Sequence, residues 1–140
     1  CRDLRVSCTG HLSEQEDRVA IRRAAYLFFL PATVECLALS MLEAMACGVA
    51  SVATDVGTDG EALRGAGLVV DPGNLAVELG MAIRELIELP FLSLELGRLA
   101  RQRVLDRYSL DRNLESLAKL YEELVDESPV KRFTRNAIPS

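Results

Sequence analysis

Short apolar runs, each followed by turn-forming residues, predict four strands along the chain. Residues 26–30 (YLFFL) form a continuous apolar run that ends at Pro31, which is typical of a strand covered on both faces. Residues 50–54 (ASVAT) predict a second buried strand. Two further candidates complete the set: residues 4–8, which alternate, and residues 67–70.

Helices are predicted between and after these strands. Ser13 and Glu16 form a capping-box pattern, which predicts that a helix begins there. Residues 37–47 are rich in Leu, Ala and Met, which are good helix formers, and Gly48 follows where a left-handed C-cap is expected. Three longer helices are predicted over residues 75–89, 90–107 and 109–126.

Strands that alternate with helices and give way to a helical end indicate an α/β domain with a parallel sheet. We expect this domain to span residues 1–126, because residues 127–140 lack periodicity and resemble a loose tail. Ligands of such folds bind outside the carboxyl ends of the strands. The loops over residues 31–36 and 55–60 both follow strands, so we expect the site at these two loops.

The composition narrows the class of protein. The chain has 140 residues, of which 49% are hydrophobic and 26% charged, as in one ordinary globular domain. Its net charge of −5 and the lack of a basic face argue against nucleic acid as a partner. The sequence contains no run of 18 or more apolar residues, so no membrane span is predicted.

The cysteines and the start of the chain bear on its location. The four cysteines form no CxxC pair and have no histidines at ligand spacing, so we expect free thiols in a reducing compartment. No secretory leader is apparent, and a cytoplasmic location is expected. Because the first residue is Cys1 rather than methionine, we expect the sequence to be part of a longer protein.

Two carboxylates stand out in an otherwise apolar stretch, PATVECLALSMLEAMACG. Glu35 precedes the predicted helix and Glu43 lies within it, about 12 Å further along a helical axis. At that separation they cannot share a proton or one metal ion. They are suited to binding the hydroxyl groups at two ends of one ligand, with the free N–H groups of the helix start facing anionic oxygens between them. This order suits a nucleoside-diphosphate sugar. The alternative is a helix-terminal charge at Glu35 and a solvated surface residue at Glu43.

A longer stretch carries a family resemblance. LFFLPATVECLALSMLEAMACGVASVATDVGTDGE resembles the nucleotide-sugar-binding half of retaining glycosyltransferases of family 4, which have the GT-B fold. The Glu-seven-Glu spacing followed by Glu-Ala-Met-Ala is the specific part of the match. GLVVDPGN and the closing helices are also similar, so the resemblance covers residues 4–126. It implies a Rossmann-like parallel sheet flanked by helices.

The resemblance implies roles for individual residues. Glu35 is expected to be the catalytic residue, binding hydroxyls of the donor sugar beside the reacting carbon, while Glu43 binds the ribose hydroxyls. The backbone of Leu37, Ala38 and Leu39 is expected to approach the sugar and the diphosphate, with Cys36 in the same loop. Possible rim residues of the site are Gly57, Glu61 and His11.

The resemblance also implies the reaction and the partners. Retaining hexosyl transfer from a nucleotide-diphosphate sugar to a glycan, lipid or other acceptor is expected, in polysaccharide biosynthesis. No metal and no cofactor are expected. The acceptor would bind an amino-terminal domain that this sequence lacks, and a peripheral contact with a membrane surface would come through that half.

Two departures keep a second interpretation open. Cys36 and Ala38 replace the two glycines that the family usually has in this loop, and glycine is suited to a close approach of backbone to ligand. The family's basic Arg and Lys for the diphosphate are also not in this sequence. We therefore expect a partial donor site without turnover on its own. The alternative is a non-catalytic module of the same fold, for nucleotide binding or protein association.

Overall fold

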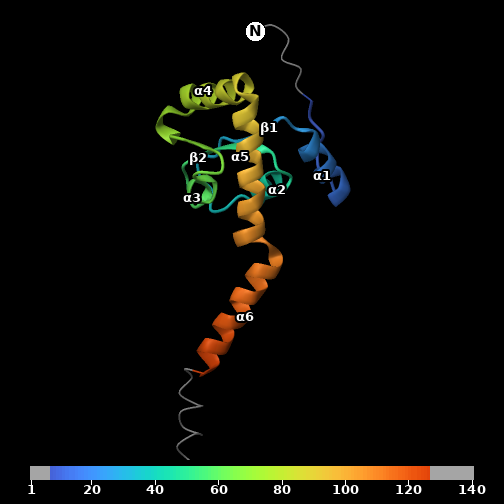
Figure 1. Cartoon of the computed structure of the whole chain (residues 1–140), viewed down its shortest axis with the longest axis vertical. Helices are drawn as coiled ribbons and strands as arrows, with labels where there is room; N and C mark the ends of the chain where they lie inside the picture. Colours follow the sequence, from blue (N-terminus) through green and yellow to red (C-terminus); the bar gives the residue numbers. More distant parts are fainter. Residues whose placement is uncertain (1–6, 127–140) are drawn as a thin grey trace, which may run out of the picture. The chain divides into compact units, whose positions relative to one another are not determined.

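The computed structural model describes residues 7–126, and its elements alternate as the sequence predicts (Figure 1). In chain order they are α1 (Gln15–Ala24), β1 (Leu27–Leu30), α2 (Leu39–Ala46), β2 (Ala50–Thr54), α3 (Asp59–Leu63), β3 (Leu68–Val70), the 3-10 turn η1 (Pro72–Asn74), α4 (Leu75–Glu88), α5 (Pro90–Arg103), the π-helical segment η2 (Val104–Tyr108) and α6 (Leu110–Asp126). The chain divides after Arg103 into two compact units. Each unit is described by itself.

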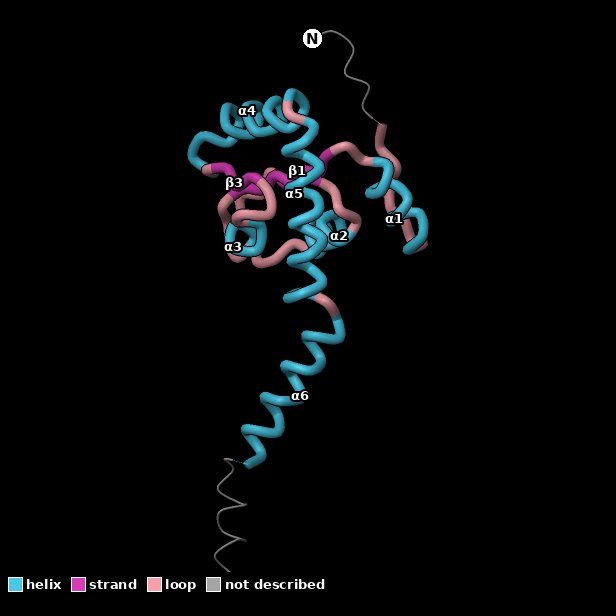
Figure 2. Tube along the Cα trace, in the orientation of Figure 1, coloured by secondary structure: helices cyan, strands magenta, loops and turns pink. Residues whose placement is uncertain are grey.

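The first unit is built on a parallel sheet with the strand order β1-β2-β3. Leu27 lies opposite Ala50, and Val52 lies opposite Leu68. Every residue of β2 is buried, because this strand lies between its two neighbours and beneath helices. Figure 2 shows α4 on one side of the strands and α2 with α3 on the other. The predicted Rossmann-like parallel sheet flanked by helices is therefore confirmed.

The core joins the sheet to the helices around it. Leu86 of α4 is fully buried and packs with Val52 of β2 and Leu96 of α5. Burying one such aliphatic side chain stabilises a fold by about 1.5–3 kcal/mol. At the start of β2, α5 comes close to the backbone, since a Cβ on Gly97 would lie 2.2 Å from the carbonyl oxygen of Gly48. Gly48 itself has a φ of 76°, as predicted for a left-handed cap.

Three expectations about local structure need correction. Phe29 is 50% exposed, so β1 is not covered on both faces; it is an edge strand of the described sheet. The capping box does not form: α1 begins after Glu14, and the Ser13 hydroxyl donates to the Glu14 carboxylate instead of capping the helix. Residues 7–8 of the first predicted strand are not in a strand, and residues 4–6 lie outside the described range.

The second unit is helical in its described part. The predicted helix over residues 90–107 ends earlier, at Arg103, and the π-helical segment η2 follows. Ser109 then caps α6, because its hydroxyl accepts a hydrogen bond from the Arg112 N–H at 3.4 Å. The helical end is thus confirmed, while the predicted tail over residues 127–140 lies outside the described residues. None of the described helices combines the length and apolar composition that crossing a bilayer requires.

Candidate functional site

The two loops expected to form the site are in direct contact. Thr58 donates two hydrogen bonds to the Cys36 carbonyl oxygen, one from its N–H and one from its hydroxyl, each at 2.7 Å. Gly57 has a φ of 54°, and a Cβ there would lie 2.1 Å from the Glu35 carbonyl oxygen. A side chain at Gly57 would therefore force the loops apart. The loop after β2 therefore holds the backbone of the loop after β1 in place through these contacts.

Glu35 lies in the first of these loops with a half-buried side chain. Its carboxylate accepts a hydrogen bond from the N–H of the next residue, Cys36, at 3.1 Å. Cys36 itself is exposed. The carboxylate is thus turned back over its own loop, next to the start of α2, and one of its oxygens is free of this bond.

The backbone at the start of α2 is only partly available to a ligand. The N–H groups of Leu37, Leu39 and Ser40 make no hydrogen bond with the residues that the structure describes. The Ala38 N–H, by contrast, donates to the carboxylate of Asp59 at 2.8 Å. Ala38 is buried, whereas Leu39 is 73% exposed. Of the three predicted backbone contacts, those of Leu37 and Leu39 face no competing acceptor.

The sequence suggests that Asp59 is first a turn former, with contact at the sugar or phosphate rim as the less favoured alternative. Asp59 is fully buried at the first residue of α3, and its Oδ2 has no hydrogen-bond partner among the described residues. Burial raises the pKa of the Asp59 carboxyl, and the nearby negative charge of Glu35 raises it further, while the hydrogen bond from Ala38 opposes both effects. An aspartate beside glycines in a loop is typical of a turn, so nothing in the sequence indicates that Asp59 is buried.

Glu43 lies one turn further along α2, where it forms an ion pair with Arg22 of α1. Both residues line a cavity of 610 Å³, and His11 lines it as well. Ile21 and Phe28 contribute apolar walls to the same cavity. The predicted ribose acceptor and the predicted rim histidine therefore share one cavity. Arg22 was missed because a salt bridge across 21 residues of sequence leaves no local pattern.

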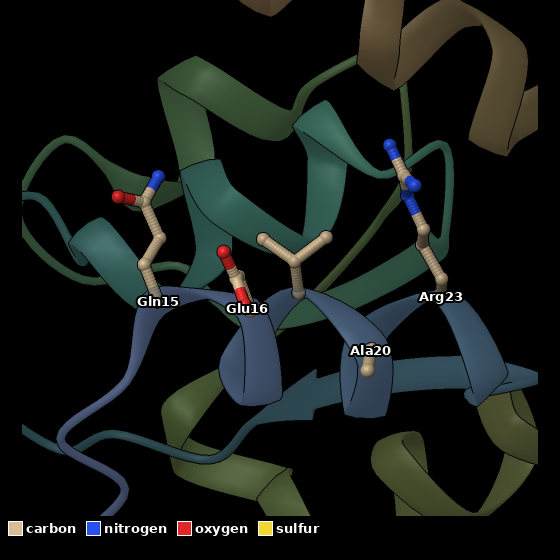
Figure 3. Close-up of a pocket in the computed structure, with 5 residues that line it drawn as sticks. Gln15, Glu16, Ala20 and Arg23 are labelled. Atoms are coloured by element: carbon tan, nitrogen blue, oxygen red, sulfur yellow. The ribbon is translucent and has the colours of Figure 1, made fainter.

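The other predicted residues lie elsewhere. Glu35 is not among the residues that line the 610 Å³ cavity, and Glu61 is exposed on α3. Within residues 7–126, no group of three or more His, Cys, Asp or Glu side chains is close enough to hold a metal ion. A separate depression of 490 Å³ follows one face of α1, where Gln15, Glu16 and Arg23 project from the helix (Figure 3). It contains none of the predicted site residues.

Comparisons with known proteins identify the family and the fold of the chain. A family model described as glycosyl transferases group 1 matches residues 2–89. Among solved structures, sucrose-phosphate synthase from Thermosynechococcus elongatus is similar, with 29% sequence identity and a TM-score of 0.70. The alignment covers 77% of this chain and 27% of that protein, so this chain spans about a quarter of its length. No curated protein matches the sequence.

Proposed function

This chain belongs to the group 1 glycosyl transferases, and we propose that it carries part of the donor site of a retaining, metal-independent hexosyltransferase. The donor is a nucleotide-diphosphate sugar. Since the chain corresponds to 27% of the similar synthase, the acceptor site belongs to the rest of the protein in this proposal. The proposed acceptor is a glycan or a lipid-linked sugar in polysaccharide assembly.

The observation that carries the proposal is the 610 Å³ cavity beside α2. Its volume lies within the usual range for small-molecule sites. His11 offers a ring and a hydrogen-bonding nitrogen for a nucleobase, and Glu43 offers carboxylate oxygens for the two ribose hydroxyls. Apolar side chains between them suit the flat faces of a base.

The other end of the donor is assigned to the loop after β1. The free N–H groups of Leu37 and Leu39 can donate hydrogen bonds to phosphate oxygens in this proposal, because a helix start favours negative charge. The exposed part of Glu35 is then the group that holds the sugar hydroxyls near the reacting carbon. In this arrangement the protein acts by positioning the donor and by stabilising charge as the diphosphate leaves.

The proposed function also suggests where the protein acts in the cell. We propose a cytoplasmic location for this protein. A lipid-linked acceptor would bring it to a membrane surface through the acceptor-binding part.

Calorimetric titration tests the two glutamates separately. We expect the chain to bind one of uridine, guanosine or adenosine diphosphate, and Glu43→Ala to weaken that binding by about tenfold or more, equivalent to about 1.4 kcal/mol. Glu35→Ala should leave nucleoside-diphosphate binding unchanged, because its partner is the sugar. In the protein that the complete reading frame encodes, Glu35→Ala should instead reduce sugar transfer. Negligible effects of both substitutions would contradict the assignment.

A non-catalytic module of the same fold is the second candidate. The observation that favours it is the occupied Ala38 N–H, together with Cys36 where close backbone approach is expected. Under this alternative, nucleoside diphosphates bind but the complete protein transfers no sugar from any of the three nucleotide-sugar classes. Transfer activity that Glu35→Ala abolishes would exclude it.

A further inference from the structure

The Arg22 side chain connects α1 to the wall of the 610 Å³ cavity. One terminal nitrogen of its guanidinium donates to the Arg18 carbonyl oxygen at 3.1 Å, and the other donates to Oε2 of Glu43. The Arg22 side chain is 17% exposed, against 49% for Glu43. The arginine is therefore the more buried partner of the ion pair, with a second hydrogen bond that restrains its guanidinium.

A relay of hydrogen bonds fixes Arg22 in turn. Arg18 donates to the carbonyl oxygens of Leu12 and Ser13, at 3.0 and 2.8 Å, and its own carbonyl oxygen accepts from Arg22. Leu12 also lines the cavity. The segment before α1, the helix itself and Glu43 are thus joined through two arginines. A shift of the segment around Leu12, which forms one wall of the cavity, would therefore also move the Glu43 carboxylate, which lies in another wall.

The ion pair also separates two cavities. Arg18, Arg22 and Glu43 line both the 610 Å³ cavity and a second one of 250 Å³, which extends toward Cys47. Without Arg22 the glutamate would be free to turn toward either space. With Arg22 in place, Oε2 is held and Oε1 makes no hydrogen bond with the part of the chain that the structure describes, so a carboxylate oxygen remains for a ligand.

From this geometry we infer that Arg22 is a positioning residue for donor binding: it holds the Glu43 carboxylate at the wall of the larger cavity, with one oxygen directed to the nucleotide. The inference rests on the proposed function, because it gives Glu43 the role of ribose acceptor. Arg22 acts through Glu43 and not on the sugar. It should therefore affect the affinity for the nucleotide part of the donor and leave the transfer step unchanged.

The test compares dissociation constants for the best-binding nucleoside diphosphate among the three named above. Arg22→Ala should weaken binding by about tenfold, as expected when a charge-assisted contact that orders the binding group is lost. Arg22→Gln keeps much of the aliphatic part of the side chain and one donor for the Arg18 carbonyl oxygen, so it should give an intermediate affinity. Because this variant is less disruptive than Arg22→Ala, it also controls for a loss of binding that is caused by misfolding. The matched control is Arg23→Ala, one residue along α1, which makes no ion pair with the described residues and should bind as the unchanged chain does.

A double-mutant cycle separates positioning through Glu43 from a direct role. In a Glu43→Gln background, Arg22→Ala should have no further effect on affinity. An unchanged or tighter affinity of Arg22→Ala, or a full tenfold loss in the Glu43→Gln background, would overturn the inference. If Glu43→Ala has no effect on nucleotide binding, the proposed function itself fails. If Glu43→Ala weakens binding and Arg22→Ala does not, only the positioning role fails.

Discussion

The carboxyl group of Asp59 links the two loops of the candidate site at the level of single atoms. One oxygen binds the Ala38 N–H and the other has no partner among the described residues, although the residue is fully buried. Burial disfavours the charged form of such a group, which is why it raises the pKa of the Asp59 carboxyl. Its protonation state therefore affects both the stability of the fold and the charge beneath the donor loop.

The raised pKa of Asp59 predicts a pH-dependent contribution to stability. The folded state binds this proton more tightly than the unfolded state, so the free energy of unfolding should fall as pH rises from the ordinary carboxyl value of about 4 through the raised folded pKa. Asp59→Asn keeps an acceptor for the Ala38 N–H and does not titrate. Denaturant unfolding of both proteins from pH 4 to pH 8 should show this fall in the unchanged chain alone, as a widening difference in favour of the variant. Parallel profiles would contradict the raised pKa.

Residue-scale prediction from sequence succeeded where a residue's surroundings are local. The positions of Glu35, Glu43 and Gly57 at or beside the carboxyl edge of the sheet followed from the order of strands and helices. Asp59 and Arg22 could not be placed in this way. Each makes its contact across 21 residues of sequence, so its partner depends on tertiary packing.

At the scale of elements, the contact between the two loops depends on a glycine. Gly57 combines a positive φ with a backbone oxygen where its Cβ would be. The strand ends next to it are joined by the Thr54 hydroxyl, which donates to the Leu30 carbonyl oxygen at 3.2 Å. The site is therefore carried by rigid connections between β1 and β2.

Gly57→Ala should destabilise the chain by about 2 kcal/mol or more, since it adds backbone strain and a clash with the Glu35 carbonyl. Gly80→Ala provides the matched control. Gly80 lies within α4 with no atom within 4 Å of an added Cβ, and alanine there should stabilise by about 0.5–1 kcal/mol. Urea unfolding monitored by circular dichroism measures both. Similar changes for the two variants would show that the loops tolerate a side chain at Gly57.

Helices and strands were predicted well because their apolar periodicity is strong, and the errors have physical causes. A continuous apolar run does not reveal whether a strand is central or at an edge, and β1 is an edge strand with Phe29 half exposed. Ser13 matched a capping pattern, but the backbone makes Glu14 the residue before α1. A local pattern predicts that a helix begins nearby, but it does not define the first helical residue to better than about one or two positions.

At the scale of the whole molecule, the two units differ in how they bury apolar surface. The first contains the sheet and its core. In the second, every side chain from residue 110 to residue 125 is exposed, and leucines recur at positions 110, 114, 117, 120 and 124. Helix α6 is thus amphipathic, while its apolar stripe adds little burial to this chain.

Removal of α6 should therefore leave the first unit folded. A chain that ends after Ser109 is expected to unfold within a few degrees of the intact chain and to bind the same nucleoside diphosphate, because every element of the sheet core is retained. Thermal melts and the calorimetric titration measure this directly. A large fall in the melting temperature, or loss of binding, would show that α6 stabilises the donor site.

The close approach of Gly97 to Gly48 has a consequence for engineering donor preference by exchanging segments between relatives. The turn that closes α2 and the middle of α5 fit together because Gly97 carries no side chain; a Cβ on Gly48, by contrast, would lie 3.9 Å from the Gly97 carbonyl oxygen, an ordinary contact. If α2 and its closing turn were moved into a homologue with a larger residue at the position of Gly97, that side chain would clash with the backbone of the turn. Successful chimeras should therefore inherit both segments from the same parent.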